Sequence, residues 1–83
     1  MNQEEILKIV NEICKDVFEN DELIITNDTI AKDVPGWDSL AHLSLINEIE
    51  NEFNIKLKLK EIQGAKNVGE LINFISNHLE GEQ

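Results

Sequence analysis

The 83-residue chain has no arginine and no tyrosine, and it contains a single cysteine, a single proline and a single tryptophan. One cysteine excludes an intramolecular disulfide and a cysteine-based metal cluster. No hydrophobic run approaches the roughly 20 residues of a membrane-spanning helix, and the acidic N-terminus is unlike the basic start of a signal peptide. We therefore expect a cytoplasmic protein that does not insert into membranes.

Basic residues are also scarce: seven lysines stand against 17 acidic residues, which gives a net charge of −10. This composition disfavours nucleic-acid binding, because contacts to phosphates need clustered lysines and arginines. Residues 1–54 hold the whole of the net negative charge, whereas residues 55–83 are neutral. The uneven distribution favours a partner with a basic patch. The alternative is that the acidity only keeps the protein soluble.

Hydrophobic residues make up 41% of the chain and recur with helical periodicity, so we expect a folded domain. A chain of this length forms one domain, assigned here to residues 1–83, with little room for an enclosed catalytic cleft. The periodicity predicts helices over residues 3–19 and 39–53, and a third from a cap at Asn67 to about Leu79. Cys14 falls in the apolar stripe of the first helix and is expected in the core.

The connections between these helices are less regular. Residues 20–37 form a long loop, and loops of this length are usually functional or pinned by side chains. The candidates for pinning are its apolar residues: Leu23, Ile24, Ile25, Ile30, Val34 and Trp37. Pro35 and Gly36 make the turn into the second helix. Residues 55–60 alternate between apolar residues and lysines, a pattern that alone suits an edge strand.

The most informative segment is Asp38-Ser39-Leu40, at the predicted start of the second helix. Asp38 is a suitable N-cap, because its carboxylate can accept hydrogen bonds from free N–H groups of the first turn. Ser39 falls in that turn with an outward hydroxyl, whereas Leu40 is expected to begin the buried face. The free N–H groups and the positive end of the helix dipole favour an anion attached at this point.

This segment and the helix after it resemble the acyl carrier protein family. The resemblance rests on the Asp-Ser-Leu motif, on the ending Glu50-Asn51-Glu52-Phe53, and on an apolar stripe: Leu40, Leu43, Ile46, Ile49 and Phe53. It extends from about Glu4 to Leu79. The fold that it implies is all-α, an antiparallel bundle of three main helices plus one short helix near residues 59–63.

In that family, the serine of this motif carries a phosphopantetheine arm through a phosphodiester. The resemblance implies that a phosphopantetheinyl transferase, using magnesium and coenzyme A, attaches the arm to Ser39. Asp38 would contribute to recognition by the transferase, and Leu40 would anchor the turn. The thiol of the arm would hold an acid as a thioester and present it to acyl-loading and acyl-consuming enzymes with basic docking patches. The chain would then be a monomeric carrier and not an enzyme.

The resemblance also implies a partner surface on the second helix, made of acids around a small apolar patch. Leu45 is expected to point away from the core stripe as a member of that patch, with Glu48 and Glu52 near the same outer face. Read without the resemblance, Leu45 is an incidental exposed leucine. His42 is expected to be an exposed residue that touches the phosphate of the arm or a partner.

Two other functions follow from the residues. An unmodified acidic helical module that binds a basic partner needs only the docking face. An enzyme would need Ser39 and His42 as a nucleophile and base, but no third group is evident to orient the imidazole. His42 and His78 have no companions for a metal site, and His78 suits the negative end of the last helix dipole.

Some positions differ from those of common fatty-acid carriers. Ala41, His42 and Ser44 stand where acids often follow the motif, Asn47 stands where methionine is frequent, and lysines replace acids near the third helix. These differences favour a specialised carrier with its own cognate enzymes, in a dedicated acyl, aminoacyl or polyketide route.

Overall fold

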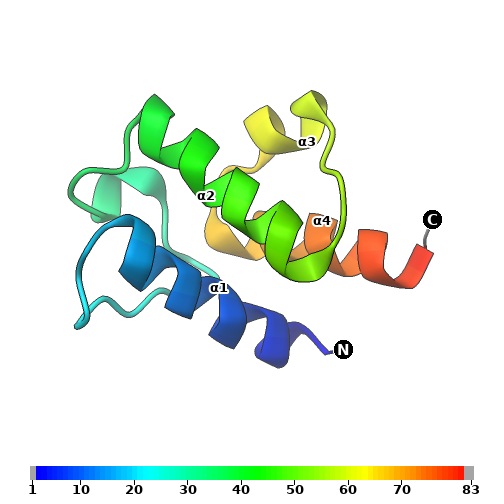
Figure 1. Ribbon diagram of the computed structural model, residues 1–83, viewed down its shortest axis with the longest axis horizontal. Helices are drawn as coiled ribbons and strands as arrows, with labels where there is room; N and C mark the ends of the chain where they lie inside the picture. The colour runs from blue at the N-terminus through cyan, green and yellow to red at the C-terminus, as the bar shows by residue number, and fades with distance from the viewer. Residues whose placement is uncertain (1, 82–83) are drawn as a thin grey trace.

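The computed structural model describes residues 2–81, and the backbone alone for Leu59. Its elements are α1 Gln3–Val17, the 3-10 helix η1 Ala31–Asp33, α2 Ser39–Phe53, α3 Leu59–Gly64 and α4 Val68–Gly81 (Figure 1). The described residues contain no β-strand. The all-α fold class is therefore confirmed. Of the alternating residues 55–60, residues 55–58 form a loop and residues 59–60 begin α3.

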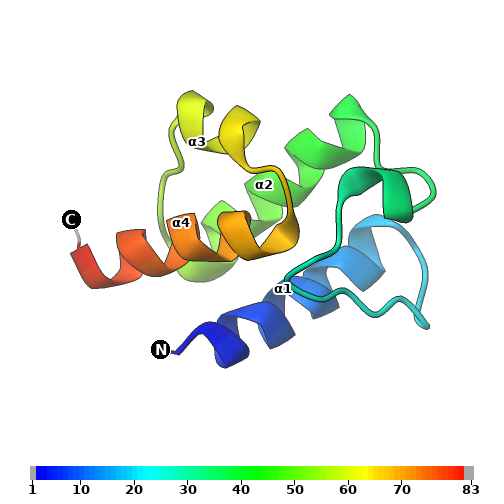
Figure 2. The same ribbon diagram turned by 180° about the vertical axis from the view of Figure 1, so that it is seen from behind.

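The three long helices enclose one core, and α3 lies to one side. Helix α1 packs against both α2 and α4, and α3 lies against α4, as two opposite views show (Figures 1 and 2). In both views, the start of α1 and the end of α4 lie on the same side of the molecule. The start of α2, which bears Ser39, lies at the opposite end.

The core is formed by apolar residues from α1, α2 and α4 with a few loop residues. Its fully buried members include Ile6, Val10, Cys14, Leu45, Ile49, Ile72 and Ile75. The prediction that Cys14 lies in the core is confirmed. Burial raises the pKa of the Cys14 thiol to about 12, so the nucleophilic thiolate is not formed near neutral pH.

The helix boundaries follow local capping signals. Asn2 accepts a hydrogen bond from the Glu5 N–H and the Glu5 carboxylate accepts one from Asn2, a capping box that begins α1. Helix α1 ends at Val17, two residues before the predicted end, with Phe18 as its C-cap. Helix α2 has the predicted bounds, and Asn54 ends it in the left-handed conformation, with φ 56°.

The long loop is pinned to α1 by Asn11. The Asn11 side chain accepts a hydrogen bond from the Ile25 N–H (2.6 Å) and donates one to the Leu23 carbonyl (3.3 Å). Ile25 is buried as predicted, but Ile24 is 80% exposed and does not pin the loop. The Asn11 contacts hold the backbone of Leu23 and Ile25 against α1, and the Ile24 side chain between them is exposed.

The same loop caps α4. The Thr29 and Asn27 carbonyls accept hydrogen bonds from Val68 and Gly69 N–H, both at 2.9 Å. A Cβ added at Gly69 would lie 3.0 Å from the Asn27 carbonyl oxygen, so glycine permits this close approach. The predicted cap by Asn67 is also present, since its side chain accepts a hydrogen bond from the Glu70 N–H at 2.8 Å.

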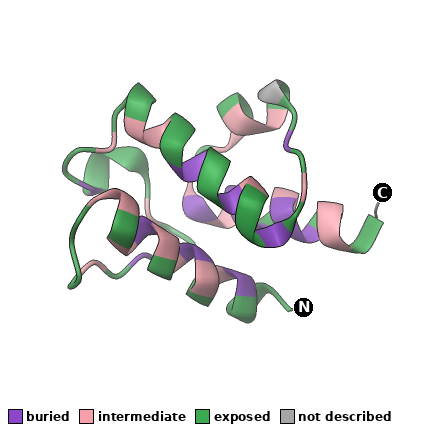
Figure 3. Ribbon diagram, in the orientation of Figure 1, coloured by how far each residue is buried: buried purple, intermediate pink, exposed green. Residues whose placement is uncertain are grey.

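The rotation of α2 differs from the prediction. Leu45 is fully buried, whereas Leu40 and Leu43 are 75% and 57% exposed. Figure 3 shows buried stretches of α2 only in its later part, where they alternate with exposed ones. The expectations that Leu45 faces outward and that Leu40 anchors a buried corner are therefore wrong. At about 100° per residue, Leu45 lies within about 40° of Ile49 around the helix, whereas Leu40 lies about 180° from it.

Candidate functional site

The chain turns sharply just before α2. Gly36 has a φ of 87°, a conformation that glycine adopts without strain. The Trp37 N–H donates to the Val34 carbonyl (3.2 Å) and the Asp38 N–H donates to the Gly36 carbonyl (3.0 Å). This turn delivers Asp38 in extended geometry to the first position outside α2.

Asp38 is the N-cap of α2, as predicted. Its Oδ1 atom accepts a hydrogen bond from the Ala41 N–H at 2.9 Å, and its carbonyl accepts the His42 N–H at 2.9 Å. Within residues 2–81, the N–H groups of Ser39 and Leu40 have no hydrogen-bond acceptor. The start of α2 therefore keeps two free donors beside the Ser39 side chain.

Ser39 is exposed and is the first residue of α2. It lines an open cavity of about 500 Å³, here called the outer cavity, whose other lining residues are Ala31, Trp37, Asp38, His42, Leu43, Ile62 and Gln63. A phosphate ester on the Ser39 oxygen would lie near the free N–H groups and the positive end of the α2 dipole. These residues thus fit a phosphate-linked group at Ser39, with an apolar surface beside it.

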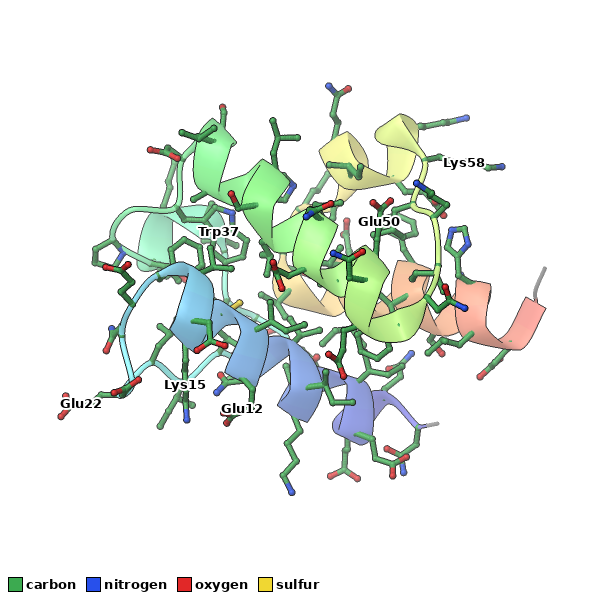
Figure 4. The ribbon with its side chains drawn as sticks, viewed as in Figure 1. Glu12, Lys15, Glu22, Trp37, Glu50 and Lys58 are labelled. Atoms are coloured by element: carbon green, nitrogen blue, oxygen red, sulfur yellow. The ribbon has the colours of Figure 1, made fainter. Side chains whose placement is uncertain are left out.

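Trp37 is half-buried beneath this turn. Its ring packs against Phe18 at the end of α1, with ring centroids 5.3 Å apart, and Figure 4 shows it between α1 and the start of α2. Its Nε1–H donates a hydrogen bond to Nδ1 of His42 at 3.1 Å. The apolar pinning role predicted for Trp37 is confirmed.

His42 is half-buried, so its predicted exposed position is wrong. Nδ1 accepts from Trp37, and Nε2 lies 3.2 Å from the Ile62 carbonyl oxygen in α3. Since both ring nitrogens have partners other than Ser39, the geometry does not form the dyad considered from the sequence. The helical spacing placed His42 near Ser39, but its two partners come from separate segments and gave no local signal.

The exposed face of α2 carries apolar side chains near Ser39 and acidic side chains farther along the helix. Leu40 and Leu43 are exposed near the start of the helix, and Glu48 and Glu52 are exposed farther along, as predicted. Leu40 and Glu48 also line a second shallow groove of about 540 Å³, together with Asp16 of α1. The exposed face of α2 thus carries the acids that were expected there, but its exposed leucines are Leu40 and Leu43 in place of Leu45.

His78 lies on α4 and contacts α3. Its Nε2 atom is 2.8 Å from Oε1 of Glu61, and the same carboxylate oxygen accepts the Lys58 N–H at 2.9 Å. Burial raises the pKa of the Glu61 carboxyl, but the hydrogen bonds from His78 and Lys58 and their positive charges outweigh it. The net effect is a pKa below the usual value of 4.5. This pair fastens α3 to α4.

A small helical domain with an outward serine and free N–H groups at a helix start is suited to carry a phosphate-linked arm. Residues 4–75 match the family described as "Phosphopantetheine attachment site". The chain therefore contains a phosphopantetheine attachment domain, and phosphopantetheine is its prosthetic group.

The curated relatives and a solved structure define the family more narrowly. The acyl carrier protein of Thermosynechococcus vestitus is 35% identical over 78 residues, covering 93% of this chain and 95% of that protein. That of Lactobacillus acidophilus is 30% identical over 78 residues, covering 94% and 98%. The chain belongs to the acyl carrier protein family.

The fold agrees with a solved member of the family. The solution NMR structure of holo acyl carrier protein from Geobacter metallireducens superposes with a TM-score of 0.84 at 38% identity, covering 89% of this chain and 85% of that chain. As a member of this family, the chain carries acyl groups and works with acyl-handling enzymes. Every helix within residues 2–81 is too short or too polar to cross a membrane.

Proposed function

We propose that Ser39 is the attachment residue, and that the chain acts as one carrier domain that holds acyl or aminoacyl groups as thioesters on a phosphopantetheine arm. The observation that carries this proposal is the exposed Ser39 side chain at the first position of α2, beside two N–H groups without acceptors. The arm supplies the thiol that forms the thioester. The protein supplies an exposed oxygen, a capped helix start and a docking surface.

The other serines are less suited to this role. Ser76 is buried, with 7% of its surface exposed. Ser44 is exposed on α2, but it lies in the interior of the helix, where the backbone N–H groups are used by the helix itself. Ser44 is therefore a matched control for Ser39, because it is an exposed serine on the same helix without the free donors.

The test is an intact-mass measurement after incubation with coenzyme A, magnesium and a broad-specificity phosphopantetheinyl transferase. The wild type and Ser44→Ala should each gain the mass of one phosphopantetheine group, and Ser39→Ala should gain none. Circular dichroism should show that Ser39→Ala stays helical. An unmodified wild type, or a modified Ser39→Ala variant, would refute the proposal, and the first result would favour an unmodified acidic binding module.

We further propose that partner enzymes dock on the exposed face of α2. Leu40 and Leu43 supply apolar contacts beside the arm, and Glu48 and Glu52 supply negative charge for a basic patch on the partner. Asp38 contributes to recognition by the transferase through its exposed position next to Ser39. These side chains are not required by the core, so they are free to serve recognition.

The pathway proposed for this carrier is a specialised acyl, aminoacyl or polyketide route. Support comes from the residues that surround the site. Ala41, His42 and Ser44 make the first half of α2 less acidic than is usual for common fatty-acid carriers, and Asn47 stands where methionine is frequent. Lys56, Lys58 and Lys60 are exposed near α3. Intact-mass analysis of the protein recovered from its native host would reveal both the arm and the acid bound to it.

A further inference from the structure

Both histidines of the chain contact the short helix α3, at adjacent residues. His78 approaches Glu61 from α4, and His42 approaches the Ile62 carbonyl from α2. The His78 contact lies at α4, away from the outer cavity that Ser39 lines. The His42 contact lies in that cavity, and the hydrogen bond between His42 and Trp37 connects it to the turn before Ser39.

The partners of His42 define its proton position. The indole Nε1–H of Trp37 can only donate, so Nδ1 of His42 must be the acceptor and carries no proton. Nε2 then carries the proton and donates to the Ile62 carbonyl. The neutral imidazole satisfies both contacts at once. A protonated imidazole has N–H groups on both sides and loses the contact with Trp37.

Trp37 and His42 also line two cavities. One is the outer cavity of about 500 Å³ at Ser39. The other, here called the inner cavity, has a volume of about 70 Å³ and reaches Ala65, Val68 and Leu71. Because the hydrogen-bonded Trp37–His42 pair borders both, it forms part of the wall between the arm-attachment surface and the inner cavity, which reaches the buried Val68 and Leu71 of α4.

We propose that His42 is a positioning residue. In its neutral form, its hydrogen bonds with Trp37 and the Ile62 carbonyl, here called the latch, hold the turn before Ser39 against α3 and close the wall between the two cavities. Protonation of His42 releases Trp37 and opens this wall. The charged groups that line the two cavities are Asp38 in the outer and Lys66 in the inner. On α3, the Glu61 carboxylate is held by His78. Any effect of this opening on the arm or its acyl group rests on the proposed function at Ser39, but the latch is a property of the unmodified chain.

Fluorescence provides a direct test, because Trp37 is the single tryptophan and the chain has no tyrosine. On acidification of the unmodified protein from about pH 8 to 5, where histidines change charge, the emission should shift to longer wavelength as the indole meets water. In His42→Gln, the side-chain amide supplies one acceptor and one donor that are joined through a single carbon, as the two ring nitrogens of histidine are. The amide does not change its charge in this pH range. Its emission should stay at the wild-type pH 8 position throughout.

His78→Gln is the matched control, because it removes the other histidine contact to α3 and leaves Trp37 untouched. This variant should keep the full fluorescence shift. A shift that persists in His42→Gln, or that is lost in His78→Gln, would overturn the proposal.

Amide hydrogen exchange tests the contact with α3. At pH 8, amides of residues 60–64 should exchange about five-fold faster in His42→Leu than in His42→Gln, as expected for the loss of one hydrogen bond. Equal rates in two folded variants would contradict the latch, and if His42→Leu does not fold, the fluorescence of His42→Gln decides. Both readouts use the unmodified chain, so their failure is separate from a failure of Ser39 to accept the arm.

Discussion

The two parts of α2 have different surroundings although they belong to one continuous helix. Residues 39–44 include no buried side chain, whereas residues 45–53 place Leu45, Ile46, Ile49 and Phe53 in the core. The first part bears Ser39 and the exposed leucines, and the second part holds the helix against α1. The difference indicates that the core contacts of α2 lie in its second part, so the exposed leucines of the first part can vary with little effect on stability.

The largest expected effect is a difference in stability between alanine variants of Leu43 and Leu45, two leucines that lie two residues apart. Leu45→Ala should lower the free energy of unfolding by about 2–5 kcal/mol, because it leaves a cavity in the core. Leu43→Ala should change it by less than about 0.5 kcal/mol, as is usual for exposed positions. Urea unfolding followed by circular dichroism measures both. Similar losses in the two variants would mean that the division of α2 is incorrect.

The next effect concerns recognition at the exposed part. Leu40→Glu should lower kcat/KM of a phosphopantetheinyl transferase about ten-fold, which corresponds to about 1.4 kcal/mol, because it places a charge where an apolar contact is proposed. Ile24→Glu is the control, since Ile24 is equally exposed but lies outside the cavities that Ser39 and Leu40 line. Equal kinetics for both variants would exclude Leu40 from the docking surface.

A smaller effect is expected where the core part of α2 ends. Asn54 adopts positive φ, so Asn54→Ala should cost about 1 kcal/mol of stability, since alanine is strained in this conformation. Asn54→Gly should retain near wild-type stability, because glycine adopts it freely. Thermal unfolding of the two variants gives the comparison, and a more stable alanine variant would argue against the left-handed cap.

The smallest expected effect is the loss of stability when the Glu61–His78 contact between α3 and α4 is weakened. Helix α3 also borders the exposed part of α2 through Ile62. Because the fold lowers the pKa of Glu61 below 4.5, its ionised form stabilises the folded state above that pH. This stabilisation is lost as pH falls through the lowered pKa. Glu61→Gln should therefore be less stable than wild type at pH 7, by less than about 1 kcal/mol. Urea unfolding should show the difference vanishing in acid, and a constant difference would contradict the ionic contribution.

Much of the fold was predictable because its signals are local. The bounds of α2 follow from the Asp38 cap and the Asn54 stop, and both act on neighbouring backbone groups. The end of α1 was predicted two residues too far because a propensity pattern fades gradually at a helix end. The short 3-10 helix at residues 31–33 was not predicted, since three residues give no periodicity.

The rotation of α2 was predicted incorrectly for a physical reason. Steps of three residues from Leu40 through Leu43, Ile46 and Ile49 look continuous in the sequence, but each step turns the helix by about 300°. The drift carries Leu40 to the side opposite Ile49. The packing of α1 and α4 selects the side that contains Leu45, and no residue near Leu45 specifies this choice.

The sequence by itself determined the helical content, the capped position of Ser39 and the acidity of the first two thirds of the chain, because each depends on adjacent residues or on composition. The tertiary structure alone decided which leucines are available to partners. It also decided that His42 joins Trp37 to α3, and that burial raises the pKa of the Cys14 thiol. These properties depend on contacts between segments distant in the chain, and side-chain burial and hydrogen-bond partners are set only when the helices pack.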